Sequence, residues 1–342
     1  MKSAISALIG RKVTSMRRIG GGRNSKVYKL MVGNSEPYAA KVYFHHLLDN
    51  RNRMQVEFHS LQFLWKHGFR CISQPIGMDM ERGCAVYEYI DGSKIRPRDV
   101  SNDDIEFAAH FLVRLAACRD KEGSKELPLA SEACFSIQDI VGVIERRLAR
   151  LLTVRHDAPE YDALQRYLKT EFIPAFETIK RWGKARLNQS GMSSGSGVPP
   201  EEWVLSPSDF GFHNALRRNT GNIVFLDFEY FGWDDPAKMV SDVLLHPAMD
   251  LRTDLKELFF ATIMRNFKLH GEFSRRIEIA YPFFGLNWCL ILLNEYVPEH
   301  LERRTFAGRK LNLAHLLEDQ LSKSIRMLNH IRSDYERFPY RS

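Results

Sequence analysis

Cysteine is scarce in this sequence, and its placement excludes a disulfide framework or a structural zinc site. The five cysteines are odd in number and scattered, with no C-x-x-C pair and no spacing typical of metal ligands. We therefore expect reduced thiols in a cytoplasmic protein. The chain also has no internal repeat and no motif of an RNA-recognition domain, so we expect no nucleic-acid partner despite a net charge of +7.

Strong targeting and membrane-spanning patterns are also missing. A weakly apolar run at residues 3–10 follows Lys2, but it has no hydrophobic signal core and no small-residue cleavage pattern. The most apolar stretch, residues 279–293, is shorter than the ~20 residues that a bilayer-spanning helix needs, and it contains Pro282 and Asn287. We expect a buried helix there and no transmembrane segment.

The patterns that are present divide the chain into two parts. Before about residue 90, strand-like runs flank one helical pattern at residues 54–65, which predicts a small sheet with one helix. After the turn pair Asp91-Gly92 the patterns are mainly helical. We predict an α+β fold with a sheet-rich lobe at residues 1–90 and a larger helical lobe at residues 91–342. The expected strands are residues 26–32, 38–44 and 85–90, and the expected helices are residues 105–119, 137–154, 162–186, 283–296 and 311–332.

Residues 188–200 read NQSGMSSGSGVPP and interrupt the helical region. Serine, glycine and proline offer almost no apolar surface to pack, so we expect a mobile loop. Two short strands follow, at residues 203–205 and 223–226, with a polar loop between them.

A glycine run opens the first segment that can carry chemistry. Gly20, Gly21 and Gly22 precede Ser25 and a strand-like run. Consecutive glycines let backbone N–H groups approach phosphate oxygens, and the serine hydroxyl adds a donor. A plain turn before a strand has the same composition, so this run alone does not decide the matter.

A lysine interrupts the next apolar strand, in Tyr38-Ala39-Ala40-Lys41-Val42-Tyr43. Such a lysine either faces solvent or holds nucleotide phosphates, and the upstream glycine run favours the second role. It then needs a carboxylate to fix its position. Glu57 lies sixteen residues later on the predicted helix and fits that role, with an exposed helix carboxylate as the alternative.

Two polar residues five positions apart lie in the loop between the short strands, in the sequence LSPSDFGFHNAL. Asp209 can accept the proton of an attacking hydroxyl, and the amide oxygen of Asn214 can bind Mg²⁺. Both residue types also bond their own backbone in ordinary loops.

The strand after this loop ends in L-D-F-E. A carboxylate at the mouth of a buried strand is costly unless it is paired or bound to metal, which favours Asp227 as a Mg²⁺ ligand. Strand alternation predicts that Glu229 points to the same side, where it can bind the metal directly or through water.

Together these segments resemble the aminoglycoside phosphotransferase and choline kinase branch of the protein-kinase-like fold, over roughly residues 17–245. In that branch the catalytic loop usually reads H-G-D-x-x-x-x-N or H-N-D-x-x-x-x-N, and the next strand ends in I-D-F-E or I-D-W-E. This chain has P-S-D-x-x-x-x-N and L-D-F-E. The resemblance implies two lobes, a small antiparallel sheet in the first, and the cofactors ATP and Mg²⁺. The roles that it implies are Asp209 as catalytic base, Asn214 and Asp227 as metal ligands, and Lys41 with Glu57 as the phosphate-positioning pair.

The chain departs from that family at Pro207, where the family has a histidine that braces the loop. The proton acceptor and metal ligands are present, which favours an active enzyme over a nucleotide-sensing pseudokinase. The resemblance also implies that residues 85–92 form the hinge between lobes, where backbone groups of Glu88 and Ile90 meet the adenine. Side chains there do not distinguish ATP from GTP.

The acceptor is predicted to be a small molecule with a hydroxyl group. The short interval between Asp227 and the pair Asp235-Pro236 leaves no room for a peptide-binding activation segment, and the A-P-E and H-R-D motifs of protein kinases are missing. Asn287, Trp288 and Glu295 form the polar edge of a predicted helix. They are candidates to bind an amino alcohol, a sugar or an aminosugar, with a plain core helix as the alternative.

Two further readings stay open from the sequence. The many arginines are compatible with a phosphorylated or carboxylated acceptor. A protein-modifying enzyme is supported only by the versatility of the fold.

Overall fold

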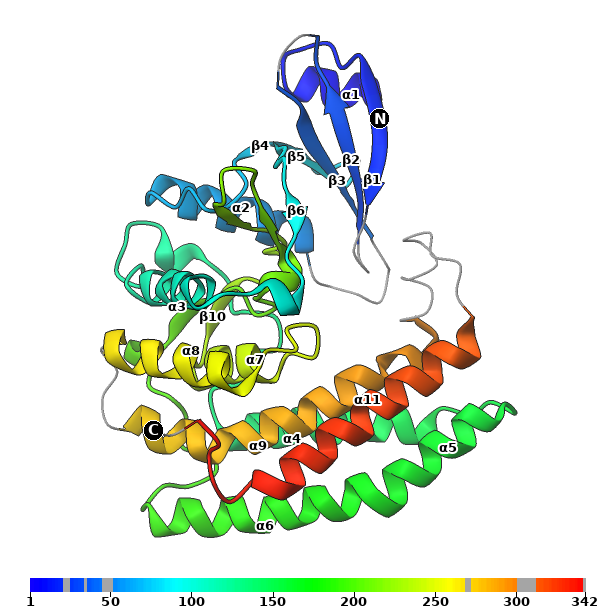
Figure 1. Cartoon of the computed structure of the whole chain (residues 1–342), viewed down its shortest axis with the longest axis vertical. Coiled ribbons are helices and arrows are strands. Elements are labelled where there is room, and N and C mark those ends of the chain that lie inside the picture. The colour runs from blue at the N-terminus through cyan, green and yellow to red at the C-terminus, as the bar shows by residue number, and fades with distance from the viewer. Residues whose placement is uncertain (21–24, 34–35, 45–51, 268–271, 300–311, 341–342) are drawn as a thin grey trace.

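The structure, a computed structural model, describes residues 1–20, 25–33, 36–44, 52–267, 272–299 and 312–340. The N-terminal part is a five-stranded antiparallel sheet with the order β1-β2-β3-β5-β4 (Figure 1). Its elements are α1 (Lys2–Leu8), β1 (Ser15–Gly20), β2 (Ser25–Met31), β3 (Tyr38–Tyr43), α2 (Arg53–Lys66), β4 (Pro75–Asp79) and β5 (Cys84–Glu88).

The two faces of this sheet have different neighbours. Ala40 on β3 and Val86 on β5 are paired in the register, fully buried, and packed in one cluster with Ile5 of α1. Because side chains alternate along a strand, Lys41 points to the opposite face, toward α2. The sheet thus aims its one buried lysine away from α1.

The N-terminal part has more elements than its sequence predicted. β1 is exposed at almost every position and β4 is a half-exposed edge strand that begins at Pro75, so neither shows the apolar alternation that identifies a strand. The expectation of a single helix was also wrong. α1 is only seven residues long with one buried side chain, Ile5, which is too short for a helical period to be read.

The C-terminal part is mainly helical, and Figure 1 shows its long helices α6, α9 and α11 side by side, at the end of the molecule opposite the sheet. The helices are α3 (Asn102–Ala116), α4 (Ile137–Thr153), α5 (Pro159–Tyr167), α6 (Ile173–Gln189), α7 (Pro236–Leu245), α8 (Thr253–Asn266), α9 (Glu272–Leu292) and α11 (Leu313–Asp334). A π-helical turn, Leu168–Phe172, joins α5 to α6.

Capping boxes fix the starts of α3 and α4. Ser101 and Ser136 each accept the backbone N–H three residues on, and Asp104 and Asp139 each accept the backbone N–H of that serine. These reciprocal bonds satisfy donors that a helix start otherwise leaves free.

Short strands carry the loops that line the site. β6 (Ser93–Lys94), β8 (Ala215–Arg217) and β9 (Ile223–Phe225) form one small sheet, and β7 (Val204–Ser206) pairs with β10 (Gly232–Asp234). Gly92 is required where the chain enters β6, since a Cβ there would lie 2.7 Å from the backbone oxygen of Arg217.

The helix around Pro282 is longer than the sequence suggested. α9 and the 3-10 turn after it make a stretch of 24 residues, Phe273–Tyr296, that is long and apolar enough to cross a membrane by length and composition. Its most apolar 18-residue window has a mean hydropathy of 1.3 and is 78% buried inside the protein, as in the core helix of a soluble protein. The expectation that this stretch is too short to span a bilayer was therefore wrong, and the expectation that it is a buried helix is confirmed.

The segment at residues 188–200 has mostly exposed side chains, and a few contacts attach it to the rest of the protein. α6 continues to Gln189 and a 3-10 turn begins at Pro200. Val198 is buried, its backbone N–H donates to the Phe135 carbonyl at 2.7 Å, and its own carbonyl accepts the indole N–H of Trp203 at 2.9 Å. Val198, the partly buried Met192 and these backbone bonds supply the attachment that serine and glycine side chains do not.

Candidate active site

One cleft of about 1590 Å³ is lined from one side by the N-terminal sheet and from the other by the helical part. Gly21 and Gly22 lie outside the described residues. Every other predicted site residue lines this cleft. They are Gly20, Ser25, Lys41, Glu57, Glu88, Ile90, Asp209, Asn214, Asp227, Glu229, Asn287, Trp288 and Glu295.

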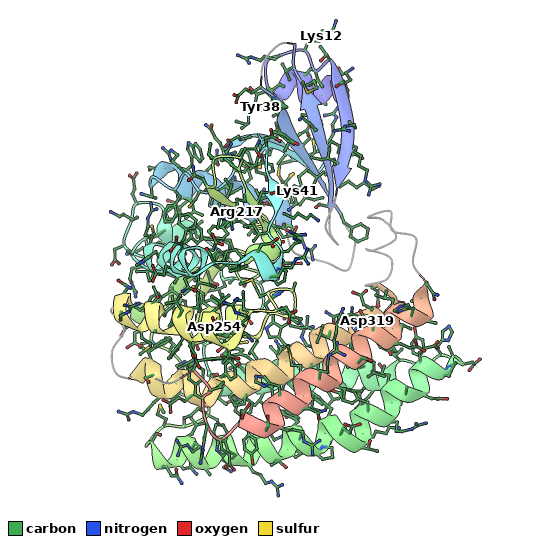
Figure 2. All side chains as sticks on the ribbon, viewed as in Figure 1. Lys12, Tyr38, Lys41, Arg217, Asp254 and Asp319 are labelled. Carbon is green, nitrogen blue, oxygen red and sulfur yellow. The ribbon has the colours of Figure 1, made fainter. Side chains whose placement is uncertain are left out.

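Lys41 is the centre of a buried charge cluster at the junction between the sheet and the helical part (Figure 2). Its Nζ lies 2.6 Å from Glu57 Oε2 and 2.5 Å from Asp227 Oδ1. Glu229 Oε2 is 3.4 Å away. Burial opposes a charge on Lys41, but these three carboxylates outweigh it and hold the pKa of the amine well above its usual range.

Tyr43 holds the carboxylate partner of this lysine. Its hydroxyl donates to Glu57 Oε2 at 2.7 Å, and the hydroxyl of Tyr87 lies 2.7 Å from that of Tyr43. Sequence reasoning missed both tyrosines. The available signal was spacing, because Tyr43 is two residues after Lys41 and therefore on the same face of β3.

Asp227 and Glu229 reach the same lysine by a route that the sequence did not predict. β9 ends at Phe225, so strand alternation does not apply to the residues after it. Asp227 instead adopts a left-handed backbone conformation, with φ +69°. This turn brings both carboxylates to Lys41. Asp227 and Glu229 therefore point to the same side, as expected, but strand alternation is not the reason.

The loop that carries Asp209 is held by its own backbone. Asp209 N–H donates to the Pro207 carbonyl at 2.9 Å across Ser208, whose φ is +65°. A tight turn of this kind is strained, and such strain is concentrated at functional sites. Asn214 Nδ2 donates to the Asp209 carbonyl at 2.9 Å, and the Asn214 carbonyl accepts the Leu226 N–H at 2.8 Å. The loops of Asp209 and Asp227 are therefore bonded to each other.

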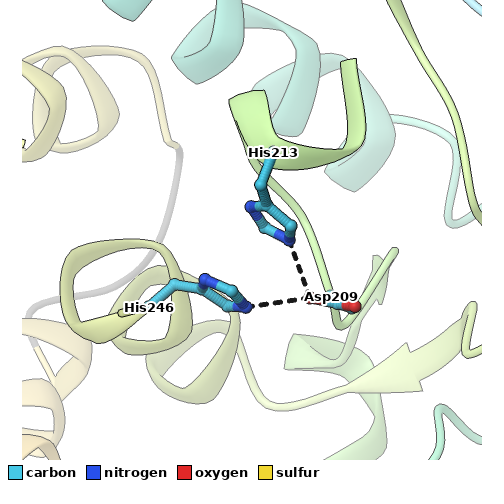
Figure 3. A group of neighbouring side chains, drawn as sticks. All are labelled: Asp209, His213 and His246. Carbon is cyan, nitrogen blue, oxygen red and sulfur yellow. Dashed lines mark hydrogen bonds and ion pairs between the residues drawn. The ribbon is translucent and has the colours of Figure 1, made fainter. Parts of the chain in front are cut away.

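Two histidines contact the carboxylate of Asp209, as Figure 3 shows. His213 Nε2 and His246 Nε2 each lie 3.0 Å from Asp209 Oδ1. Their rings stack with centroids 3.9 Å apart. Burial favours the neutral acid, but the hydrogen bonds from the two imidazoles outweigh it and hold the pKa of Asp209 well below its usual range.

His246 belongs to a polar stripe with a spacing of four residues along α7. Lys238 Nζ donates to Asp234 and to Asp242, at 2.9 Å in each case. The indole N–H of Trp288 donates to the other oxygen of Asp242 at 2.9 Å, and its ring meets the His246 ring edge to face at 4.6 Å. Sequence reasoning stopped at the start of α7 and missed the D-x-x-x-K-x-x-x-D-x-x-x-H pattern.

The start of α7 is as the sequence predicted. Asp235 caps the helix by accepting the Ala237 N–H at 2.7 Å, and Pro236 occupies the first helical position.

Comparison with protein families gives a match over most of the chain. Residues 15–274 match the model described as the phosphotransferase enzyme family, APH. The chain belongs to the APH phosphotransferase family. It is accordingly a small-molecule kinase. No curated protein sequence matched it.

Solved structures similar to this APH-family enzyme have the protein-kinase-like fold at low identity. Choline kinase LicA from Streptococcus pneumoniae has a TM-score of 0.61 at 16% identity, covering 96% of this chain and 97% of that one. Spectinomycin phosphotransferase APH(9)-Ia, in complex with ADP and spectinomycin, has a TM-score of 0.61 at 11% identity, and the match covers 93% of this chain and 97% of that one. A streptomycin–ATP–APH(2")-IIa ternary complex has a TM-score of 0.59 at 15% identity, and the match covers 98% of this chain and 97% of that one. The predicted fold, an antiparallel sheet followed by a mainly helical region, is confirmed.

Residues of this APH-family enzyme fit a hard cation at the charge cluster. Oxygens of Glu57, Asp227 and Glu229 lie within 4.8 Å of one another, and the Asp227 side chain is 30% exposed in the cleft. Asn214 uses its amide N–H₂ on a backbone carbonyl, which leaves its amide oxygen as an acceptor. Carboxylate and amide oxygens are ligands that Mg²⁺ accepts.

The residues expected to form the hinge of this APH-family enzyme begin at the end of β5. The Glu88 carboxylate bonds Arg218 at 2.5 Å, and its backbone N–H donates to Gln74 at 2.8 Å. Its carbonyl accepts the Ser73 hydroxyl at 2.8 Å and can accept one more bond. Ile90, two residues on, also lines the cleft.

The far end of the cleft has charges of both signs. Asn287 is buried, and its amide oxygen has no hydrogen-bond partner within the described part of the chain. On α4, Arg147 pairs with Glu132 and Arg150 with Glu299. Charge alone therefore does not select an anionic or a cationic acceptor.

Proposed function

We propose that this enzyme transfers the γ-phosphoryl group of ATP to a hydroxyl of a small molecule, in a reaction that depends on Mg²⁺ and uses Asp209 as catalytic base. The observation that carries the proposal is the placement of an ionised Asp209 in the same cleft as the Lys41 charge cluster. Phosphoryl transfer depends mainly on positioning and charge neutralisation, which these residues can supply.

Each part of the cluster has a distinct task in this proposal. Asp209 accepts the proton of the acceptor hydroxyl while the hydroxyl oxygen bonds to the γ-phosphorus and the bond from that phosphorus to the β-γ bridging oxygen breaks, releasing ADP. Lys41, fixed by Glu57, binds the nucleotide phosphates. Bound Mg²⁺ neutralises phosphate charge, with Asp227, Asn214 and Glu229 as its ligands.

Nucleotide recognition by backbone groups supports ATP as the donor. The Glu88 carbonyl has capacity for one further hydrogen bond, and the adenine amino group can supply it. The Ile90 N–H is the expected partner on the adenine ring. The matched ADP and ATP complexes are of relatives with the same fold.

For the acceptor, we propose an amino alcohol, a sugar or an aminosugar. The unpartnered amide oxygen of Asn287 can accept a bond from a hydroxyl or an amine. Trp288 offers an aromatic face, and Glu295 offers negative charge. Both line the cleft beyond Asp209.

The alternative is a nucleotide-sensing pseudokinase, which Pro207 favours because the bracing histidine is missing from its usual position. The two functions differ in one measurable property. An enzyme transfers phosphate to an acceptor, whereas a sensor only binds nucleotide.

The test uses Asp209→Asn, which keeps the size of the side chain and removes its basicity. Purified wild type is first screened with labelled ATP against pooled amino alcohols, sugars and aminosugars. We expect the variant to bind ATP as wild type does and to transfer phosphate ~10²-fold more slowly or worse. Asp254→Asn, at an exposed ion pair on α8, is the matched control. Equal transfer rates with and without the Asp209 carboxylate would remove it from the mechanism.

A further inference from the structure

The carboxylate of Asp209 is braced from outside its own loop. Position 207 holds proline, which has no side-chain donor. His246 follows the last residue of α7 and lies 37 positions beyond Asp209 in the chain, yet its Nε2 is 3.0 Å from Asp209 Oδ1. A residue of another element therefore contacts the proposed base.

The hydrogen bonds of His246 define its tautomer. The backbone N–H of Ala248 donates to His246 Nδ1 at 3.1 Å, so this nitrogen carries a lone pair. The single proton of the neutral ring then lies on Nε2, the atom that faces Asp209. His246 is consequently a donor to the carboxylate.

The two imidazoles also leave one carboxylate oxygen of Asp209 available. Both Nε2 atoms approach Oδ1, while no described residue makes a hydrogen bond to Oδ2. A carboxylate held at one oxygen cannot rotate freely about its Cβ–Cγ bond. Oδ2 is therefore presented to the cleft, where an acceptor hydroxyl can reach it.

The same three side chains could also suggest a metal site, since one atom of each lies within 4.8 Å of the others. A metal at His246 Nε2 needs a lone pair on that atom, and ligand histidines almost always donate their other ring N–H to an acceptor. Here the other nitrogen accepts from Ala248. The observed hydrogen bonds favour a donor to Asp209 over a metal ligand.

Neighbouring side chains keep the His246 ring in place. The edge of Trp288 packs against it, and Asp242, one turn earlier on α7, fixes the Trp288 indole N–H at 2.9 Å. The His213 ring stacks on the His246 ring, with centroids 3.9 Å apart and an interplanar angle of 10°. The ring is thus confined by packing as well as by its two hydrogen bonds.

We propose that His246 is a positioning residue that orients Asp209 for proton abstraction and takes the bracing role that the residue at position 207 cannot fill. This inference rests on the proposed function, because it concerns the same base. It assigns His246 no proton transfer of its own. Its contribution is to keep Oδ2 aligned with the hydroxyl during the reaction.

The test compares two substitutions at one position. His246→Phe keeps the ring and its contact with Trp288 but removes the donor, whereas His246→Gln places an amide N–H₂ near the position of Nε2. We expect the phenylalanine variant to lose on the order of 10- to 100-fold in kcat, with the KM for ATP unchanged, and the glutamine variant to recover most of that loss. His330→Phe, at a half-exposed histidine on α11, is the matched control.

Two measurements separate this proposal from the proposed function. Imidazole ¹⁵N chemical shifts report the tautomer without any turnover, and a proton on Nδ1 of His246 would overturn the proposal. A crystal structure of His246→Phe should show a rotated Asp209 carboxylate, and an unmoved one contradicts it. A phenylalanine variant with a kcat equal to or above that of the glutamine variant also contradicts it, because a ring that serves only packing is kept by phenylalanine and lost in glutamine. If wild type transfers phosphate to none of the acceptors while the tautomer is as expected, the proposed function fails and the hydrogen bond stands.

Discussion

The pKa of the partly buried Asp209 sets the lower limit of the pH range in which this carboxylate can accept a proton. Burial raises its pKa, whereas the donors His213 and His246 lower it and prevail. The base is therefore available well into the acid range, below the usual aspartate pKa of about 3.9. Loss of a donor must move the pKa upward, since the charged form loses a favourable bond.

We predict that His246→Phe shifts the acid limb of the kcat/KM profile to higher pH than in wild type. Wild type and His246→Phe are compared from the lowest pH at which both stay folded, with nucleotide and Mg²⁺ saturating. The His246→Gln variant serves as control and should keep the limb near its wild-type position. A phenylalanine variant whose acid limb coincides with that of wild type contradicts the assignment of the lowered pKa to these bonds.

Asp227 has two partners to satisfy in the proposed cycle, Lys41 and the metal. We predict that Asp227→Ala abolishes Mg²⁺-dependent turnover, because metal and phosphate binding weaken together. Asn214→Ala should act in the same direction but less severely, since it removes a neutral ligand. ADP release with acceptor present is the measurement, and Asp254→Ala is the control. Metal-dependent turnover in Asp227→Ala would exclude it as a ligand.

At the scale of one element, α7 carries Lys238 and Asp242 on the face that lines the cleft, because residues four apart share a helix face. Lys238 is buried between Asp234 and Asp242. Burial opposes its charge, but the two carboxylates outweigh burial and hold the pKa of Lys238 well above its usual range. Its removal leaves both carboxylates without their shared cation.

We predict that Lys238→Met lowers the free energy of unfolding by about 3 kcal/mol, the usual cost of breaking a buried ion pair. The measurement is urea unfolding near neutral pH. Lys323→Met is the matched control, because Lys323 pairs with Asp319 at the same i,i+4 spacing on α11 with both side chains about 40% exposed. Its loss should cost under about 1 kcal/mol. Equal losses would show that burial of the Lys238 pair adds nothing.

The segment at residues 190–199 is another element whose behaviour can be measured. We predict resistance of the wild-type segment to a non-specific protease, because Val198 is buried and backbone bonds join the segment to Phe135 and Gln138. Val198→Ser should speed cleavage there by removing the buried valine side chain that helps to attach the segment. A control substitution, Ser196→Ala, leaves Val198 in place. Rapid cleavage of wild type within this segment would contradict this prediction and support the mobile loop expected from the composition.

Helices and strands were predicted correctly from the sequence where one buried face gave a regular spacing of apolar residues. α3, α4 and α11 each bury one face, and their patterns marked them to within a few residues. β1 and α1 carry no such pattern, since one is exposed and the other has a single buried side chain. For the segment at residues 188–200, composition predicted few buried side chains, and backbone bonds to Phe135 and Gln138 cannot be read from composition.

At the scale of the whole molecule, the sheet and the helical part meet at the Lys41 cluster. A ligand that binds only the folded state stabilises it by mass action, by about 2.7 kcal/mol at a concentration of 100 Kd. ATP with Mg²⁺ should therefore raise the melting temperature if it binds across this junction.

We predict that Lys41→Met loses most of the Mg²⁺·ATP-dependent rise in melting temperature. Each variant is compared with itself with and without ligand, so a change in intrinsic stability does not enter. Omission of Mg²⁺ should weaken the rise in melting temperature of wild type in the same way. Replacement of ATP by GTP in the same measurement compares how well the two nucleotides bind at the expected hinge. A full rise in the lysine variant would place the phosphates elsewhere in the cleft.

The site was predictable to the extent that its residues form local motifs. Lys41, Asp209 and Asp227 each stand in a short pattern whose chemistry can be argued from spacing. His246 lies far from Asp209 in sequence, and only the packing of α7 brings them together. Trp288, expected as a substrate contact, lines the cleft, and the sequence did not predict that its indole N–H donates to Asp242. Tertiary partners of this kind leave no trace in a single sequence.

The bond between Lys41 and Asp227 joins residues 186 positions apart. A ribosome that adds about 5 to 20 residues per second completes Lys41 some 10 to 40 s before it adds Asp227. During that interval Glu57, only sixteen residues from Lys41, is the one carboxylate of the cluster already made. The emerging sheet can thus neutralise its buried lysine early. Nucleotide binding that depends on Asp227 arises only after two-thirds of the chain has been synthesised.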